Sequence, residues 1–390
     1  MNRRKFLQSS VLASTAMFLP RFLKGQTLLS ANKPLVVIQL TGGNDTLNML
    51  VPFRDDNYYR LRPTIGINKS DLLLAGDTGF HPSLSGVYSL FDEGSLTIIN
   101  NTGYPEPDRS HFRAMDIWQS ASGSGSFINT GWIGRYLDHI ENPKSHFAIE
   151  ADDTLSLALK GEVRNGLAVK NPERLFRNLS EGYFSDIAKS DGPHTHHQAS
   201  YLYKTLSETV ESADYIYKKS HIYKSKEKYP DSEFSRNLKT ISELIISGSE
   251  TKIYYASLSG FDTHIQQKPR QDQVLKTLDE GLSAFTSDLK SNKKFEDVLI
   301  LIFSEFGRRV EQNASNGTDH GKAGVVMLAS GSLKKKGMIN SLPDLSKLDD
   351  GDLKHQTDFR NIYATILKKW FGANPDLIIP GFNFELMNFI

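Results

Sequence analysis

The chain has 390 residues, and its 46 basic and 45 acidic side chains nearly cancel, so charge gives no argument for a nucleic-acid or other polyanionic partner. It has no cysteine, which excludes disulfides, thiol catalysis and thiolate metal sites. A metal ion would therefore be held by histidine nitrogens and carboxylate oxygens, donors that suit Zn²⁺, Mn²⁺, Mg²⁺, Ca²⁺ or iron.

The chain begins with a segment typical of an export signal. An Arg-Arg pair at 3–4 and a Phe-Leu pair at 6–7 precede a short apolar run at 11–19. This pattern predicts a twin-arginine signal within residues 1–30, with an ordinary secretory signal as the alternative. The apolar run is too short to span a bilayer, which takes about 20 residues, and no later segment supplies a stable transmembrane span.

Twin-arginine export places the protein in the periplasm or outside the cell and makes the translocon of that pathway a transient partner. No clear cleavage motif follows the apolar run, so an uncleaved membrane anchor is an alternative. The pathway carries proteins that are already folded, often with a metal or cofactor inserted. A twin-arginine signal is therefore compatible with a metal site in the rest of the chain.

We predict that residues 31–390 form a single α/β domain. Short apolar runs predict strands that are buried on both faces. These runs are Leu35–Leu40, Leu96–Asn100, Ile253–Leu258, Val298–Phe303 and Val325–Leu328. Helical periodicity between them, as in Arg270–Ser291, predicts a sandwich in which helices flank a mostly parallel sheet. In such sheets, ligands bind beyond the carboxyl ends of the strands.

Polar clusters lie at the ends of these predicted strands. Together they gather carboxylates and imidazoles near one edge of the sheet, which is the ligand set of a hard or borderline divalent ion. The candidate ligands are Asp45, Asp262, His264, Glu305, Asp319 and His320. Each cluster taken alone also fits a tight turn or a helix cap, as Ser110 fits an N-cap. The prediction of a site depends on their shared placement.

The ordered motifs along the chain resemble those of an exported bacterial family called domain of unknown function 1501. The motifs include Gly42–Asp45, Gly79–Pro82, Gly103–Pro105, Arg109–Phe112, Gly131–Arg135, Gly260–His264, Ser304–Arg308, Thr318–Gly321 and Thr357–Arg360. They cover nearly the whole mature chain. The resemblance implies an alkaline-phosphatase-like fold, similar to the alkaline phosphatase and sulfatase superfamily, although the substrate of the family itself is not established.

The resemblance also implies roles for single residues. In the superfamily, a Ser, Thr or Cys at the start of a helix is the nucleophile, and Ser110 occupies the matching place. Arg109, beside it, is the preferred side chain for clamping a phosphate or sulfate. Further candidates for substrate contact are Asn44, His111, Arg113 and Arg308. Surface ion pairing is the alternative for the arginines.

The residues that match the metal ligands of the superfamily are Asp45, Asp262, His264, Glu305 and His320. They imply one or two divalent ions, with Zn²⁺, Mn²⁺, Mg²⁺ and Ca²⁺ not distinguished. The chain departs from the pattern in two places. Asp262 and His264 are two residues apart rather than four, and Phe306 follows Glu305 where a histidine is expected. One complete metal site is implied, and the second lacks a donor.

Residues 143–230 are polar and rich in Ser, Lys, Tyr and His, which interrupts the rhythm of strands and helices. We predict a mainly helical insertion that caps the active edge of the sheet. Within it, a His-x-His-His tract at 194–197 is predicted to be a solvated loop rather than a metal site.

Two functions follow from these features. The first is an exported metal-dependent hydrolase that cleaves a phosphate or sulfate ester with Ser110 as the nucleophile. The alternative is a non-enzymatic structural or binding protein of the envelope that keeps the fold. For this alternative, the resemblance suggests an exported partner of the domain of unknown function 1800 family.

Overall fold

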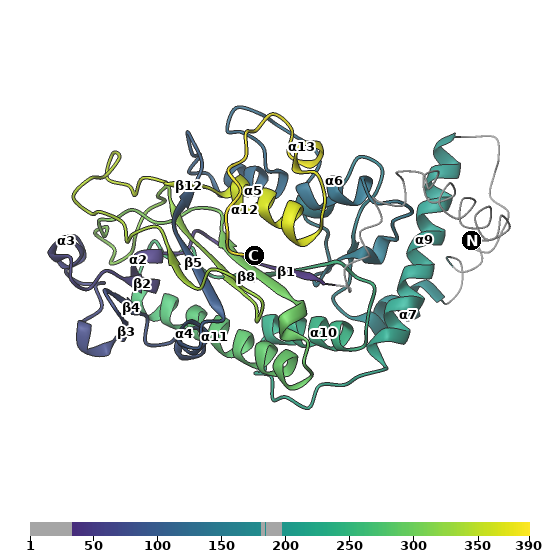
Figure 1. Cartoon of the computed structure of the whole chain (residues 1–390), viewed down its shortest axis with the longest axis horizontal. Coiled ribbons are helices and arrows are strands. Elements are labelled where there is room, and N and C mark those ends of the chain that lie inside the picture. The colour runs from purple at the N-terminus through teal and green to yellow at the C-terminus, as the bar shows by residue number, and fades with distance from the viewer. Residues whose placement is uncertain (1–32, 181–183, 185–196) are drawn as a thin grey trace, which may run out of the picture.

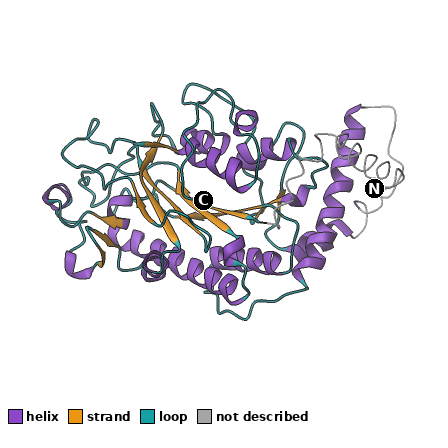
Figure 2. Cartoon of the chain, viewed as in Figure 1, coloured by secondary structure: helices purple, strands orange, loops and turns teal. Residues whose placement is uncertain are grey.

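The computed structural model describes residues 33–180, 184 and 197–390, so the predicted export signal lies outside the described residues. Figures 1 and 2 show a central sheet with helices packed on both of its faces. The α/β class predicted from the sequence is confirmed. Among the described residues, no helix combines the length and the apolar character needed to cross a membrane.

The large sheet has nine strands. Their bounds are β1 (Leu35–Thr41), β5 (Leu96–Gly103), β6 (Ala148–Glu150), β7 (Leu167–Ala168), β8 (Ile253–Ser259), β9 (Leu299–Ser304), β10 (Gly324–Ala329), β11 (Gly337–Ile339) and β12 (Thr357–Asp358). The strand order is β11-β5-β10-β9-β1-β8-β6-β7, and β12 also pairs with β5. A small antiparallel sheet contains β2 (Leu50–Val51), β4 (Thr78–Phe80) and β3 (Leu73–Ala75).

All five predicted apolar runs form strands of the large sheet. The sheet is mostly parallel, as predicted, because β1 is parallel to both β8 and β9, and β6 is parallel to β8. The exception is β10, which is antiparallel to β5 and β9.

Alternating side chains build a core on each face of the sheet. In β1, Val36 and Ile38 join one core, whereas Leu35 and Val37 join the other, because successive side chains of a strand point to opposite faces. The first core is covered by α4 (Ser85–Asp92), α10 (Glu233–Ile246) and α11 (Gln267–Ser291), which contains the predicted helix. The second is covered by α5 (His111–Ser120), α6 (Trp132–Asp138), α12 (Phe359–Thr365) and α13 (Pro375–Ile378). Two short helices, α2 (Thr46–Met49) and α3 (Asp56–Leu61), follow β1 and β2.

The described part of residues 143–230 does not lie where the sequence predicts. It contributes β6 and the edge strand β7, and its helices α7 (Pro172–Ser180) and α9 (His197–Ser220) lie beyond the amino ends of the strands (Figure 1). There the hydroxyl oxygen of Tyr215 in α9 accepts a hydrogen bond of 2.7 Å from the N–H of Glu250, just before β8. These helices therefore do not cap the carboxyl edge, which corrects the prediction. A mixed polar and tyrosine pattern predicts a half-buried helix but not the end of the sheet on which it packs.

Candidate functional site

The predicted site residues lie on loops at the carboxyl end of the sheet. Because β1, β8 and β9 are parallel, the loops that follow them leave at the same edge. The antiparallel β10 begins at this edge, so the preceding loop brings Asp319 and His320 there too. Helix α5 also begins here, after the loop that follows β5.

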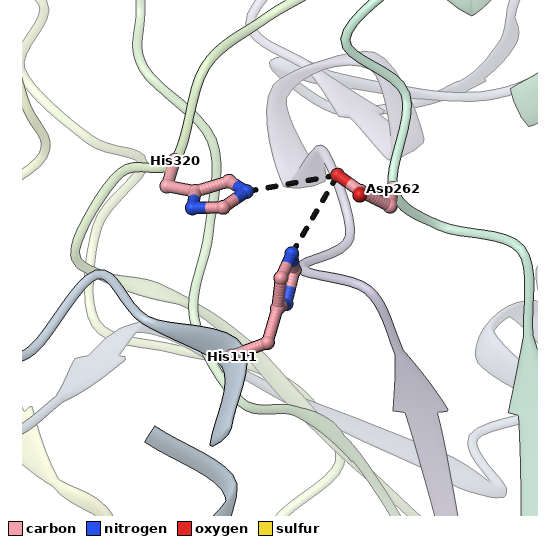
Figure 3. Close-up of side chains that lie close together, drawn as sticks. All are labelled: His111, Asp262 and His320. Carbon is pink, nitrogen blue, oxygen red and sulfur yellow. Dashed lines mark ion pairs between the residues drawn. The ribbon is translucent and has the colours of Figure 1, made fainter. Parts of the chain in front are cut away.

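Three side chains from separate loops converge in Figure 3: His111, Asp262 and His320. Oδ1 of Asp262 lies 3.6 Å from Nε2 of His111 and 3.6 Å from Nε2 of His320. His264 joins them, because its Nε2 lies 3.2 Å from the same Oδ1 and 2.9 Å from Nε2 of His320. We call these four residues the histidine–aspartate cluster.

Each imidazole of the cluster has its other nitrogen, Nδ1, against an oxygen. The pairs and their N···O distances are His111 with Glu305 (2.8 Å), His264 with Asp319 (3.1 Å) and His320 with the carbonyl of Arg109 (2.7 Å). A carbonyl or carboxylate oxygen accepts, so Nδ1 carries the hydrogen in each neutral ring and Nε2 presents a lone pair. Hydrogen bonds of this kind fix the tautomer of metal-binding histidines.

The lone pairs of the cluster fit a single cation. Nε2 of His111 is buried and makes no hydrogen bond to a described residue. In the neutral tautomers just described, the facing Nε2 atoms of His264 and His320, 2.9 Å apart, are both acceptors, and a proton or a metal cation between them relieves their repulsion. A tetrahedral Zn²⁺ ion with bonds of about 2.0–2.1 Å separates its ligand atoms by about 3.3 Å. Four of the six separations among these atoms, at 2.9, 3.2, 3.6 and 3.6 Å, lie near that value, and the ligand atoms of His111, Asp262 and His320 all lie within 4.8 Å of one another.

Local interactions shift the pKa values of the cluster in different directions. The hydrogen bond to Glu305 raises the pKa of His111, and burial lowers the pKa of His320. Partial burial favours the neutral form of Asp262, but the hydrogen bond and charge of Arg308, 2.6 Å away, outweigh it and lower the pKa of Asp262. Because the Asp262 side chain is 51% exposed, this anion is accessible from solvent.

The sequence predicts Glu305 as a metal ligand, but in the structure its carboxylate contacts Nδ1 of His111 and not the centre of the cluster. Its side chain is fully buried, and Oε1 accepts hydrogen bonds from both Nδ1 of His111 and the N–H of Gly42, each at 2.8 Å. The imidazole of His111 lies between Glu305 and Asp262. Glu305 therefore orients a ring of the cluster.

Asp45 has other partners than a metal site would require. Its Oδ1 accepts from the N–H of Leu47 at the start of α2, and its Oδ2 lies 2.5 Å from Nη1 of Arg62 and accepts from Gln267. Both charged side chains are buried. Among the described residues, no contact links the Asp45 carboxylate to the histidines, so the structure does not bring it into the cluster.

The predicted substrate contacts are also occupied. Arg109 forms an ion pair with the buried Asp352, and Arg113 donates to backbone carbonyls within residues 123–126. Asn44 is buried, with 2% of its surface exposed. The ion-pair alternative therefore describes Arg109, while Arg113 holds a neighbouring loop.

Ser110 is the exposed N-cap residue of α5. Neither its hydroxyl nor the amides of residues 111–113 make a hydrogen bond within the described part of the chain. Unpaired N–H groups and the helix dipole favour an anion at a helix N-terminus. Because α5 begins with His111, an anion bound there lies next to the histidine–aspartate cluster.

The sequence assigned His111 to substrate contact, and the structure places its ring in the cluster instead. The sequence places His111 at the start of a helix that follows a strand, and this position indicates that it lies near the site. Spacing alone does not show where its ring points. The His-x-His-His tract begins outside the described residues, so its solvation stays a prediction.

A family model described as "Protein of unknown function (DUF1501)" matches residues 100–382. No curated protein matches the sequence. Similar solved structures include the C-terminal periplasmic domain of EcEptC from Escherichia coli, with 9% identity, 91% of this chain and 88% of that chain covered, and a TM-score of 0.43. The lipoteichoic acid synthase LtaP from Listeria monocytogenes has 10% identity, coverage of 83% and 73%, and a TM-score of 0.37. The PsFucS1 sulfatase from Pseudoalteromonas sp. has 12% identity, coverage of 84% and 68%, and a TM-score of 0.38.

Proposed function

The chain belongs to the DUF1501 family, and we propose that it is a metal-dependent hydrolase of a phosphate or sulfate ester, from the geometry of its histidine–aspartate cluster, and that it is exported, from the Arg-Arg motif near its N-terminus. The observation that carries this proposal is the convergence of three Nε2 atoms on Oδ1 of Asp262, at 3.2 to 3.6 Å. Three imidazole nitrogens and one carboxylate oxygen, each with a lone pair, are the ligands that a borderline divalent ion such as Zn²⁺ binds.

In this proposal, His111, Asp262, His264 and His320 hold one ion. When bound, the ion supplies Lewis-acid stabilisation of negative charge on an ester oxygen. The chain keeps the ligands ready for it, because Glu305, Asp319 and the carbonyl of Arg109 hold the Nδ1 hydrogens and so direct each Nε2 inward.

Ser110 is the proposed nucleophile. Its Oγ attacks the phosphorus or sulfur, the bond to the ester oxygen breaks, the serine proton passes to water, and the leaving alkoxide takes up a proton. Water then releases the anion from Ser110 and restores the hydroxyl. The unpaired N–H groups of the first turn of α5 receive the non-reacting oxygens, which places the ester between Ser110 and the cluster.

Hydrolysis assays on metal-loaded protein test this proposal. We expect turnover of an aryl phosphate, a phosphodiester or an aryl sulfate, and we expect Ser110→Ala to abolish it while metal content stays the same. Ser126→Ala removes an exposed hydroxyl on a nearby loop and should retain wild-type activity.

The outcomes of the assay separate the alternatives. A fully active Ser110→Ala protein would show that the attacking oxygen comes from water rather than from the serine. Metal-loaded protein that is folded but inert on all three substrates would contradict the hydrolase and favour the binding role with an exported partner.

A further inference from the structure

A buried arginine joins the loops that carry the cluster. Nε of Arg308 donates to the carbonyl of Gly43 (2.7 Å), Nη1 donates to that of Thr318 (2.9 Å), and Nη2 donates to those of Gly42 and Phe261. These carbonyls lie on the loops after β1 and β8 and before β10, while Arg308 follows β9. One guanidinium therefore ties together three loops at this edge of the sheet, which are the loop after β1, the loop after β8 and the β9–β10 loop that carries both Arg308 and Thr318.

The same guanidinium faces the centre of the cluster. Nη2 of Arg308 lies 2.6 Å from Oδ1 of Asp262, the oxygen that the histidines surround, and Nη1 lies 3.5 Å from Nε2 of His264. The Arg308 side chain has no exposed surface, and its charge is permanent. A buried charge is costly unless it is paired, and Asp262 is the carboxylate that pairs with it in the described part of the chain.

Phe306 follows Glu305 at the position where the phosphatase pattern of the superfamily that the chain resembles leads us to expect a histidine. Its ring centroid lies 4.8 Å from that of His111 and 4.9 Å from that of His320, and a phenyl ring supplies no ligand atom. The close approach depends on Gly43, because a Cβ there would lie 2.2 Å from the ring of Phe306. Packing of this ring therefore removes a ligand position beside the cluster.

The formal charges of the cluster and its partners suit one ion. Asp262, Glu305 and Asp319 contribute three negative charges, Arg308 contributes one positive charge, and the imidazoles are neutral when their Nε2 atoms act as ligands. One divalent ion cancels the remaining two negative charges. A second ion would leave two uncompensated positive charges in a partly buried site, which is unfavourable.

We propose that Arg308 is a built-in cation that takes the place of a second metal ion and positions Asp262, so that the cluster binds one divalent ion. This inference rests on the proposed metal-dependent function. It makes Arg308 a positioning residue rather than the anion clamp predicted from the sequence.

Metal titration of the full chain tests the inference. Mn²⁺ and Zn²⁺ are titrated separately by calorimetry, and His194, His196 and His197 are replaced by alanine so that the tract adds no ion of its own. We expect one ion per chain. Arg308→Lys keeps the charge but loses the planar fork of donors, so it should bind one ion about 10–100-fold more weakly and change the visible absorption spectrum of bound Co²⁺. Arg309→Lys is the matched control and should keep the affinity and the spectrum.

Each outcome bears on one part of the account. Two ions bound at saturation would overturn the role of Arg308 while leaving a metal-dependent function intact, whereas no bound ion would overturn the proposed function itself. Unchanged affinity and an unchanged Co²⁺ spectrum in Arg308→Lys would show that the guanidinium does not position Asp262. The stoichiometry of the chain with Arg308 intact tests the inference even where the lysine variant fails to fold.

Discussion

Buried or half-buried histidines lie at both ends of the central sheet, but their surroundings differ. At the carboxyl end, three imidazoles turn their Nε2 atoms toward Oδ1 of Asp262. At the amino end, His146 packs against α9, where its ring stacks on Tyr215 with the centroids 4.1 Å apart. The same residue type therefore serves a convergent polar cluster at one end and aromatic packing at the other.

Burial alone does not separate the two cases. Nε2 of His146 is buried without a hydrogen bond to a described residue, as is Nε2 of His111. Around His146, however, a single carboxylate oxygen of Glu250 lies 4.0 Å away, and Nδ1 is 3.1 Å from the hydroxyl of Ser212. A lone imidazole of this kind is a packed side chain, whereas several lone pairs that face one oxygen form a ligand set. The two histidines differ in what lies near Nε2. That of His111 faces Oδ1 of Asp262, which two other imidazoles share, whereas that of His146 has the Glu250 oxygen 4.0 Å away.

Replacement of Asp262 should have the largest effect. Asp262→Asn removes the anionic oxygen shared by the three histidines, and we expect metal affinity to fall by more than about 100-fold, beyond the 10–100-fold cost of losing a ligand's hydrogen-bond partner. Calorimetric titration with Zn²⁺ measures the change. The variant His146→Gln should bind the metal like the unchanged chain; similar losses in both variants would remove the distinction between the two ends.

The buried His146 at the amino end of the sheet should make the free energy of unfolding depend on pH. Burial lowers the pKa of His146 from 6.5 to about 4, so between these values the unfolded chain binds a proton that the folded chain does not. The free energy of unfolding therefore falls as pH drops through this window, by at most about 3 kcal/mol from His146.

Denaturant titrations between pH 7 and 4 measure this fall. His146→Gln should flatten it, although His81, whose pKa burial also lowers to about 4, keeps part of the slope. His139→Gln, at an exposed position, should leave the slope unchanged. Equal slopes for His146→Gln and the unchanged chain would contradict the buried neutral state of His146.

Replacement of Asp319 should have the smallest effect. Asp319 touches the cluster through Nδ1 of His264 at 3.1 Å, and its side chain is 58% exposed, so water can replace part of what it supplies. We expect Asp319→Asn to weaken metal binding about 10-fold, at the low end for a partner of a ligand. A loss as large as that of Asp262→Asn, measured in the same titration, would make Asp319 a direct ligand.

The sequence predicts the centre of the fold well because the central strands are continuous apolar runs buried on both faces. It does not predict the direction of β10, since an apolar run has no direction, and the antiparallel pairing is set by the neighbouring β5 and β9. The last two strands on one side of the sheet, β6 and β7, span three and two residues, too short for a detectable pattern. The end on which α9 packs is likewise a tertiary property.

The candidate site follows the same rule. Strand ends predict which loops meet, and the structure brings Asp262, His264 and His320 together from such loops. The direction of each side chain depends on partners far away in the sequence. The carboxylate of Asp45 forms a buried ion pair with Arg62, and the contact of Nδ1 of His111 with Glu305 orients the other nitrogen of that ring toward the cluster. The spacing of residues in the sequence predicts neither of these two interactions.

X-ray absorption at the zinc edge of the metal-loaded protein tests the central claim most directly. We predict nearest atoms at about 2.0–2.1 Å with the outer-shell scattering of at least two imidazoles, which should diminish in His320→Ala but not in His146→Gln. A shell of oxygen atoms without imidazole scattering, or a spectrum unchanged in His320→Ala, would contradict a metal site in the histidine–aspartate cluster.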